Sequence, residues 1–326
     1  MKLAEIFRDN MVFQAEKPVR IFGSGKGNIS LTFATFCYEV KFAEEEWVWE
    51  LPAQSYGGPY DLAFKINGSD HVLKNVAFGD VILCAGQSNI QFQIIEEANT
   101  SPIDDDEKIR YFVSGKTLAG EDKFPGAWGI CKQDAVLRWS ALGLHIAQNY
   151  RRKKDVYVGV VGCFNGASGI RSWLPGRTLD ESVFVPIALR HTDYVTVAVN
   201  ADSFLYKKDF EPLIPFSFGN VVWYQGESDT TVEEGRVYTE LLSRLVTSWR
   251  EDLLDKTLEF IVVEICDYVN RCDDGWRAIQ ECQQKIVDVL ENVKTVTSKD
   301  VCEHSGIHPS NKEKLAEKIV KTMDLR

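Results

Sequence analysis

The sequence has little of what metal-binding, nucleic-acid-binding or membrane-spanning proteins need. Only 5 of its 326 residues are histidine, and none of its 8 cysteines forms a Cys-x-x-Cys pair. The 37 basic residues are outnumbered by 48 acidic ones, giving a net charge of −11, which argues against nucleic acid or an anionic membrane surface as partner. No apolar run approaches the roughly 18 residues that a membrane span requires.

The N-terminus lacks an apolar run of signal-peptide length. We therefore expect the chain as given to act in the cytoplasm, or to be secreted if a leader was removed. A chain of this length buries a core without disulfides, and Cys84, Cys163 and Cys266 lie in or beside apolar runs. We expect these cysteines to be reduced and to pack as small hydrophobes.

The length predicts about two domains, and the texture of the chain changes near residue 75. Residues 1–75 hold short β-branched and aromatic runs separated by glycine-rich turns, which predicts a small antiparallel β domain. The Asn67-Gly68 pair between two such runs is a hairpin signal.

Residues 76–326 alternate apolar runs with amphipathic stretches, which indicates a doubly wound α/β domain with a mainly parallel sheet. We expect buried strands at Val81–Ala85, Val156–Cys163, Asn220–Tyr224 and Phe260–Cys266. We expect helices at Ala141–Arg151, Val237–Trp249, Trp276–Leu290 and Lys312–Met323.

Three of these apolar runs lead into polar turns that contain glycine. The turns are Gly-Gln-Ser-Asn at 86–89, Asn-Gly-Ala-Ser at 165–168 and Gln-Gly-Glu-Ser at 225–228. Because ligands bind at the carboxyl ends of strands in open α/β sheets, we expect these turns to converge on one site. Glycine there lets backbone N–H groups approach a ligand, as an oxyanion site requires.

A serine after one strand and a histidine on the last loop form a candidate nucleophile and base. Ser88 and His308 occur in the chain order of α/β-hydrolases, but Ser88 lacks the second glycine of a Gly-x-Ser-x-Gly turn, which disfavours that fold. His304 and His308 have helical metal-ligand spacing, yet Gly306 and Pro309 argue against a helix, so we expect no metal site.

The sequence resembles the sialate O-acetylesterase family of the SGNH hydrolases. The resemblance rests on four blocks in order: residues 79–89, residues 166–173, the Trp-Tyr-Gln-Gly-Glu-Ser-Asp block at 223–229, and Ile-His-Pro-Ser-Asn-Lys at 307–312. Two N-terminal segments, at 11–14 and 57–60, also resemble the family. It implies a flavodoxin-like three-layer sandwich behind a small β domain. It also implies a serine carbohydrate esterase that removes O-acetyl groups, with Ser88 as nucleophile and His308 as base.

The resemblance further implies an oxyanion site built from the N–H groups of Ser88 and Gly166, with Gln225 or Glu227 from the third block. We expect Gln87, Asn89, Arg171 and Trp173 to contact substrate, with Arg171 pairing a carboxylate and Trp173 stacking on a sugar. For Arg171 an internal ion pair, and for Trp173 core packing, are equally compatible with the sequence.

The sequence departs from the family pattern at the acid that orients the histidine. The two family positions for an aspartate are occupied by Ser305 and Gly306. Glu227, Glu303 and Asp300 are the candidates for the acid, and we favour Glu227 because its block is otherwise intact.

The predicted substrate is a small acetylated sugar or oligosaccharide, with sialic acid as one candidate and acetylated xylan as another. The chemistry needs no cofactor. A non-catalytic carbohydrate-binding homologue and an esterase of non-sugar short-chain esters are the alternatives. The oligomeric state is left open.

Overall fold

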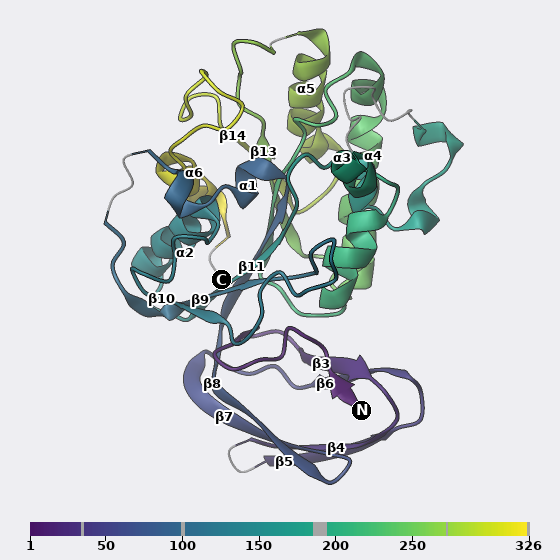
Figure 1. Cartoon of the computed structure of the whole chain (residues 1–326), viewed down its shortest axis with the longest axis vertical. Coiled ribbons are helices and arrows are strands. Elements are labelled where there is room, and N and C mark those ends of the chain that lie inside the picture. Colours follow the sequence, from purple (N-terminus) through teal and green to yellow (C-terminus); the bar gives the residue numbers. More distant parts are fainter. Residues whose placement is uncertain (34–35, 99–101, 185–193, 272, 325–326) are drawn as a thin grey trace.

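The computed structural model describes residues 1–33, 36–98, 102–184, 194–271 and 273–324. Figure 1 shows a β-rich part at one end and a larger α/β part at the other, joined by one long strand. The strand β8, Ser69–Gly86, begins in the antiparallel part and ends in the middle of the central sheet. It crosses the boundary predicted at residue 75 without a break, and that boundary stays a prediction.

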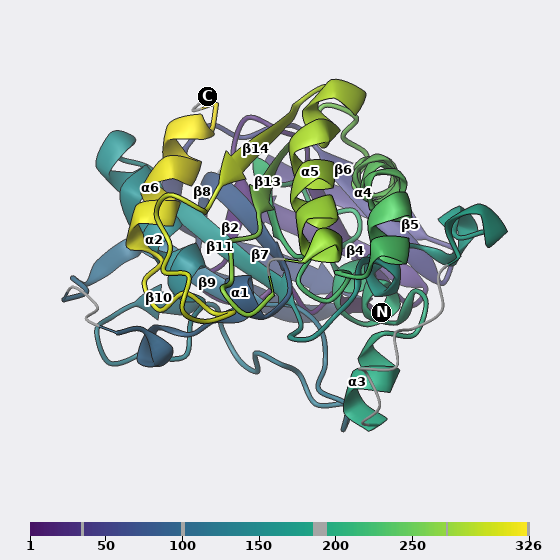
Figure 2. The same cartoon turned by 90° about the horizontal axis from the view of Figure 1, so that it is seen from above.

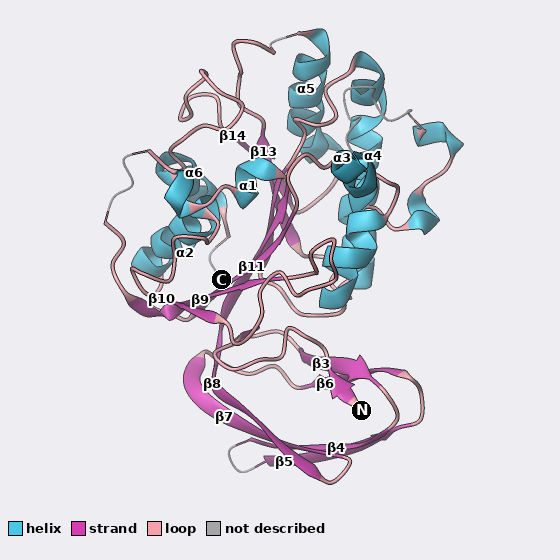
Figure 3. Cartoon of the chain, in the orientation of Figure 1, coloured by secondary structure: helices cyan, strands magenta, loops and turns pink. Residues whose placement is uncertain are grey.

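The N-terminal part consists of short strands, coloured magenta in Figure 3. Their bounds are β1 Lys2–Leu3, β2 Val12–Gln14, β3 Val19–Ser24, β4 Gly27–Phe33, β5 Phe36–Phe42, β6 Glu46–Leu51 and β7 Gly57–Ile66. Strands β1, β3 and β6 form one sheet, while β4, β5 and β7 join the N-terminal half of β8. The predicted hairpin is confirmed: Asn67 and Gly68 connect β7 to β8 with φ of 49° and 86°.

The central sheet runs in the order β10-β9-β11-β8-β12-β13-β14. The strands not yet given are β9 Asp106–Val113, β10 Gly129–Cys131, β11 Val158–Phe164, β12 Asn220–Tyr224, β13 Glu259–Glu264 and β14 Val293–Thr297. All neighbours along this order are parallel except β10 and β9. This mixed sheet confirms the predicted α/β class.

Helices cover both faces of that sheet. Their bounds are α1 Ser88–Gln91, α2 Ala141–Lys153, α3 Tyr194–Val199, α4 Val232–Asp252, α5 Asp274–Val289 and α6 Glu313–Thr322. Figure 2 shows α2 and α6 together on one side of the strands, and α4 and α5 together on the other. None of the helices that the structure describes is long and apolar enough to cross a membrane.

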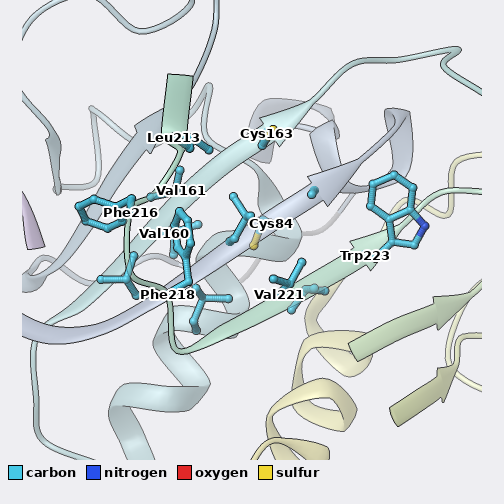
Figure 4. Close-up of a cluster of buried hydrophobic side chains, with 14 of the residues drawn as sticks. Cys84, Val160, Val161, Cys163, Leu213, Phe216, Phe218, Val221 and Trp223 are labelled. Carbon is cyan, nitrogen blue, oxygen red and sulfur yellow. The ribbon is translucent and has the colours of Figure 1, made fainter. Parts of the chain in front are cut away.

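The strands pack as continuous apolar runs because both faces of the sheet are covered. Figure 4 shows Cys84, Val160, Val161 and Val221 gathered with phenylalanines of the segment before β12. Helices α4 and α5 start where the sequence supplies a capping side chain. Thr231 and Glu234 form a capping box at α4, and Asp273 accepts a hydrogen bond from the Trp276 N–H at α5.

Helix α6 begins at Glu313, one residue after the predicted start at Lys312. Ser310 and Asn311 are residue types that favour an N-cap, but the N-cap residue is Lys312, whose side chain makes no capping hydrogen bond. Asn311 Oδ1 instead accepts from the N–H of Glu313 at 3.0 Å. The shift places Lys312 at the junction between the last loop and the helix.

Candidate active site

Ser88 is held at the carboxyl end of the central strand β8. Gly86 makes the turn with a φ of +136°, and a Cβ at this position would lie 2.1 Å from the carbonyl oxygen of Tyr224 on β12. Only glycine allows this close approach and this backbone conformation. Ser88 follows two residues later as the first residue of α1, so its N–H has no partner within that helix.

His308 faces Ser88 from the loop between β14 and α6. Its Nε2 lies 2.8 Å from Ser88 Oγ, which is the distance of an O–H donating to a neutral imidazole. The structure therefore brings together the two residues that the sequence singles out as nucleophile and base, although they are 220 positions apart.

The environment of His308 favours the neutral ring that a general base needs. Partial burial of the ring and the positive charge of Lys312 lower the pKa of His308, and Glu96 opposes them. Phe92 lies beside the imidazole, with ring centroids 6.2 Å apart. At neutral pH the imidazole can therefore accept the Ser88 proton.

The predicted triad acid does not reach the histidine. Glu227 is buried, and its Oε1 accepts a hydrogen bond from Asn89 Nδ2 at 2.5 Å, while its Oε2 has no partner among the described residues. Burial raises the pKa of Glu227. The motif places this residue at the correct strand end, but the side chain turns toward Asn89 rather than toward the imidazole.

The other two candidate acids also have different partners. Glu303 accepts from the N–H and the hydroxyl of Ser310, and Asp300 pairs with Lys318 at 2.6 Å. Within the described residues, no carboxylate is hydrogen-bonded to the His308 ring. The predicted Ser–His–acid triad is thus present in the structure only as its Ser–His part.

The loop that carries His308 is instead tied down through its backbone. Asn89 Nδ2 donates to the carbonyl oxygen of Ile307 at 2.9 Å, and Asn89 Oδ1 accepts from Lys312 Nζ at 2.8 Å. The predicted substrate contact Asn89 is only 1% exposed, so in this structure it is a buried link between the serine turn and the histidine loop.

Gly166, the predicted oxyanion donor, lies next to the serine. A Cβ on Gly166 would be 3.7 Å from Ser88 Cβ. Its N–H is not free, however, because it donates to Gln91 Oε1 at 2.7 Å. Sequence reasoning missed Gln91, whose position at the end of α1, three residues after the nucleophile, is the signal that would have found it.

Gln225 does not take part in an oxyanion site in this structure. Its side chain is fully buried, and its Nε2 donates to Gln87 Oε1, Ser168 O and Asp229 Oδ2 at 3.1, 2.9 and 2.5 Å. Gln87 is buried as well and accepts from the N–H groups of Gly226 and Ser228. Both buried glutamines therefore cross-link the turns.

The remaining predicted substrate contacts have internal partners. Arg171 forms a bidentate pair with Asp202 at 2.9 and 2.6 Å, the internal pairing that the sequence left open. Trp173 is 0% exposed and packs against Trp223, with its Nε1 donating to Ser168 Oγ at 3.0 Å. A ring without exposed surface cannot stack on a sugar, so Trp173 belongs to the core.

Comparison with known proteins defines the class and then the family. The chain is a carboxylic ester hydrolase, as its α/β fold and its serine–histidine geometry suggest. The family model described as "Carbohydrate esterase, sialic acid-specific acetylesterase" matches residues 78–323. The chain belongs to this family, which confirms the resemblance found in the sequence.

Individual relatives agree with this assignment. Human sialate O-acetylesterase is 23% identical over 370 residues, covering 98% of this chain and 69% of that protein. The mouse sialate O-acetylesterase is 24% identical, covering 98% and 72%. A solved carbohydrate acetylesterase from Xanthomonas citri superposes with a TM-score of 0.84 at 25% identity, covering 98% of this chain and 73% of that one.

Proposed function

We propose that this chain removes O-acetyl groups from carbohydrates through an acetyl-enzyme on Ser88. The observation that carries the proposal is the 2.8 Å contact between Ser88 Oγ and His308 Nε2 at the carboxyl edge of the sheet. Membership of a carbohydrate esterase family supports a sugar acetate as the substrate class. The names of the relatives point to O-acetylated sialic acid as the first sugar to test.

The first half of the reaction forms the acetyl-enzyme. Ser88 Oγ attacks the acetyl carbonyl carbon while its proton passes to His308 Nε2. The N–H groups of Ser88 and Gly166 stabilise the resulting oxyanion, provided that Gln91 Oε1 gives up its hydrogen bond to Gly166. The C–O bond to the sugar then breaks, and His308 returns the proton to the leaving sugar hydroxyl.

The second half releases acetate. A water molecule loses a proton to His308 and attacks the acetyl carbon, and the proton then returns to Ser88 Oγ as the acyl bond breaks. The lowered pKa of His308 keeps its ring neutral and ready to accept protons in both halves. None of these steps requires a metal ion or an organic cofactor.

No carboxylate among the residues that the structure describes is hydrogen-bonded to His308, and this observation favours one competing function, a carbohydrate-binding homologue without activity. Acetate release from a panel of O-acetylated sialic acids, xylo-oligosaccharides and p-nitrophenyl esters separates the possibilities. We expect acetate from at least one sugar, rejection of butyryl and longer esters, and loss of activity by about 10³-fold or more in Ser88→Ala.

A chain that binds the sugars but releases no acetate would be the inert homologue. Equal rates on acetyl and butyryl esters with no sugar deacetylation would indicate an esterase of non-sugar esters. A fully active, folded Ser88→Ala variant would overturn the serine mechanism.

A further inference from the structure

Lys312 is a buried cation that the proposed reaction does not use. It is 0% exposed and occupies the N-cap position of α6. A positive charge at a helix N-terminus opposes the helix dipole, so stabilisation of α6 does not explain the residue. Burial of an ionised ammonium is also costly unless hydrogen bonds and opposite charges compensate it.

The hydrogen bonds of Lys312 lead to the catalytic loop through a single amide. Lys312 Nζ donates to Asn89 Oδ1 at 2.8 Å, and Asn89 Nδ2 donates to Glu227 Oε1 and to the carbonyl oxygen of Ile307. Oδ1 and both Nδ2 hydrogens of Asn89 are therefore engaged. Since Ile307 directly precedes His308, the position of the imidazole depends on this amide.

Several titratable groups from different elements surround Lys312. Glu227 follows β12, Glu97 accepts the Lys312 backbone N–H at 2.8 Å, and Glu303 and Cys302 lie on the loop after β14. The rings of Phe92 and Tyr224 have their centroids 4.9 and 6.0 Å from Nζ. Burial lowers the pKa of Lys312 to about 8 against the opposing pull of these acids, so the lysine is mainly charged at neutral pH.

We propose that Lys312 is a positioning residue for His308, acting through Asn89 on the Ile307 carbonyl. We call the chain of hydrogen bonds from Lys312 through Asn89 to the Ile307 carbonyl the clamp. In this chain the clamp takes over the role of orienting His308 from the acid, since Ser305 and Gly306 occupy the two family positions for an aspartate. The inference rests on the proposed function, because it assigns the clamp to the same Ser88–His308 pair. The charge of Lys312 also acts on the imidazole directly, since it lowers the pKa of His308.

The test is the pH–rate profile of Lys312→Met, which keeps the length of the side chain and removes its charge and hydrogen bonds. We expect kcat on p-nitrophenyl acetate to fall about 10- to 100-fold as the imidazole loses its alignment, with little change in KM. We also expect the acid limb to move to higher pH, because the positive charge of Lys312 no longer lowers the pKa of His308, although burial of the ring still does. Lys314→Met, an exposed lysine two residues away, is the matched control and should keep the wild-type profile.

An unchanged kcat and acid limb in folded Lys312→Met would overturn the inference while leaving the serine mechanism intact. An active Ser88→Ala would instead overturn the proposed function. Should Lys312→Met fail to fold, NMR titration of the wild-type His308 ring decides. We expect an inflection below pH 6.5 and a second step near pH 8 as Lys312 loses its charge, and a single inflection at or above 6.5 would overturn the inference.

Discussion

At the scale of single residues, the sequence predicted which positions meet but not which atoms face each other. Ser88 and His308 are in contact as expected. Glu227, Gln225 and Trp173 lie in the expected turns, but their side chains bond to neighbouring turns or fill the core. A motif places a residue at the end of a strand, whereas rotamers and local hydrogen bonds, which the motif does not encode, decide where the side chain points.

The hydrogen bond of Glu227 predicts how kcat changes when the residue is replaced by glutamine. Because its carboxylate bonds to Asn89 and not to His308, Glu227→Gln preserves an oxygen for Asn89 and should lower kcat by less than about tenfold. Replacing a true triad acid by its amide lowers kcat by about 10⁴-fold. Steady-state kinetics on p-nitrophenyl acetate distinguishes these two outcomes, with Glu303→Gln as the control variant. A fall in kcat of more than about 10³-fold would restore Glu227 as the triad acid.

At the scale of elements, the sequence predicted the strands and helices whose patterns are clean. The strand Asn220–Tyr224 has the predicted bounds, and α2 and α5 differ from theirs by a few residues. Strands β9 and β14 were not predicted, since charged or polar residues interrupt their apolar runs, and β10 was missed because it is only three residues long. Arg110 within β9 is buried because its guanidinium donates to the carbonyls of Asn10 and Asn75, a compensation that no local pattern reveals.

The turn between β8 and α1 supports a prediction about stability. Gly86→Ala forces a Cβ to within 2.1 Å of the Tyr224 carbonyl and into a positive φ, so we expect a loss of about 2 to 5 kcal/mol in the free energy of unfolding. Urea denaturation measures this change in the free energy of unfolding. Gly306→Ala is the control, since a Cβ there would lie 3.9 Å from its nearest neighbours, the backbone atoms of His308. A Gly86→Ala variant as stable as this control would contradict the prediction.

At the scale of the whole molecule, the two predicted domains are closely joined. Strand β8 pairs with β7 in the β-rich part and with β11 and β12 in the central sheet. Arg20 of β3 donates to the carbonyls of Leu253 and Leu254 at 3.0 and 3.3 Å. Lys17 pairs with Asp255 at 2.6 Å. The sequence showed the change in texture near residue 75 but could not show these contacts, because they link segments more than 200 residues apart.

This linkage predicts that the chain unfolds as one cooperative unit. Differential scanning calorimetry should give a single transition whose calorimetric and van't Hoff enthalpies agree. Arg20→Ala removes buried hydrogen bonds between the two parts and should lower Tm. Two separate transitions in the wild-type chain would show instead that the β-rich part is an independent domain.

We propose Ser88, activated by His308, as the nucleophile. Inactivation by a fluorophosphonate, followed by mass spectrometry of the modified peptides, tests this role. We expect one label per chain, located on Ser88, with loss of acetate release in proportion to labelling, and slow labelling of folded His308→Ala. Full labelling of Ser88 with undiminished acetate release, or inactivation with the label on another residue, would contradict this role.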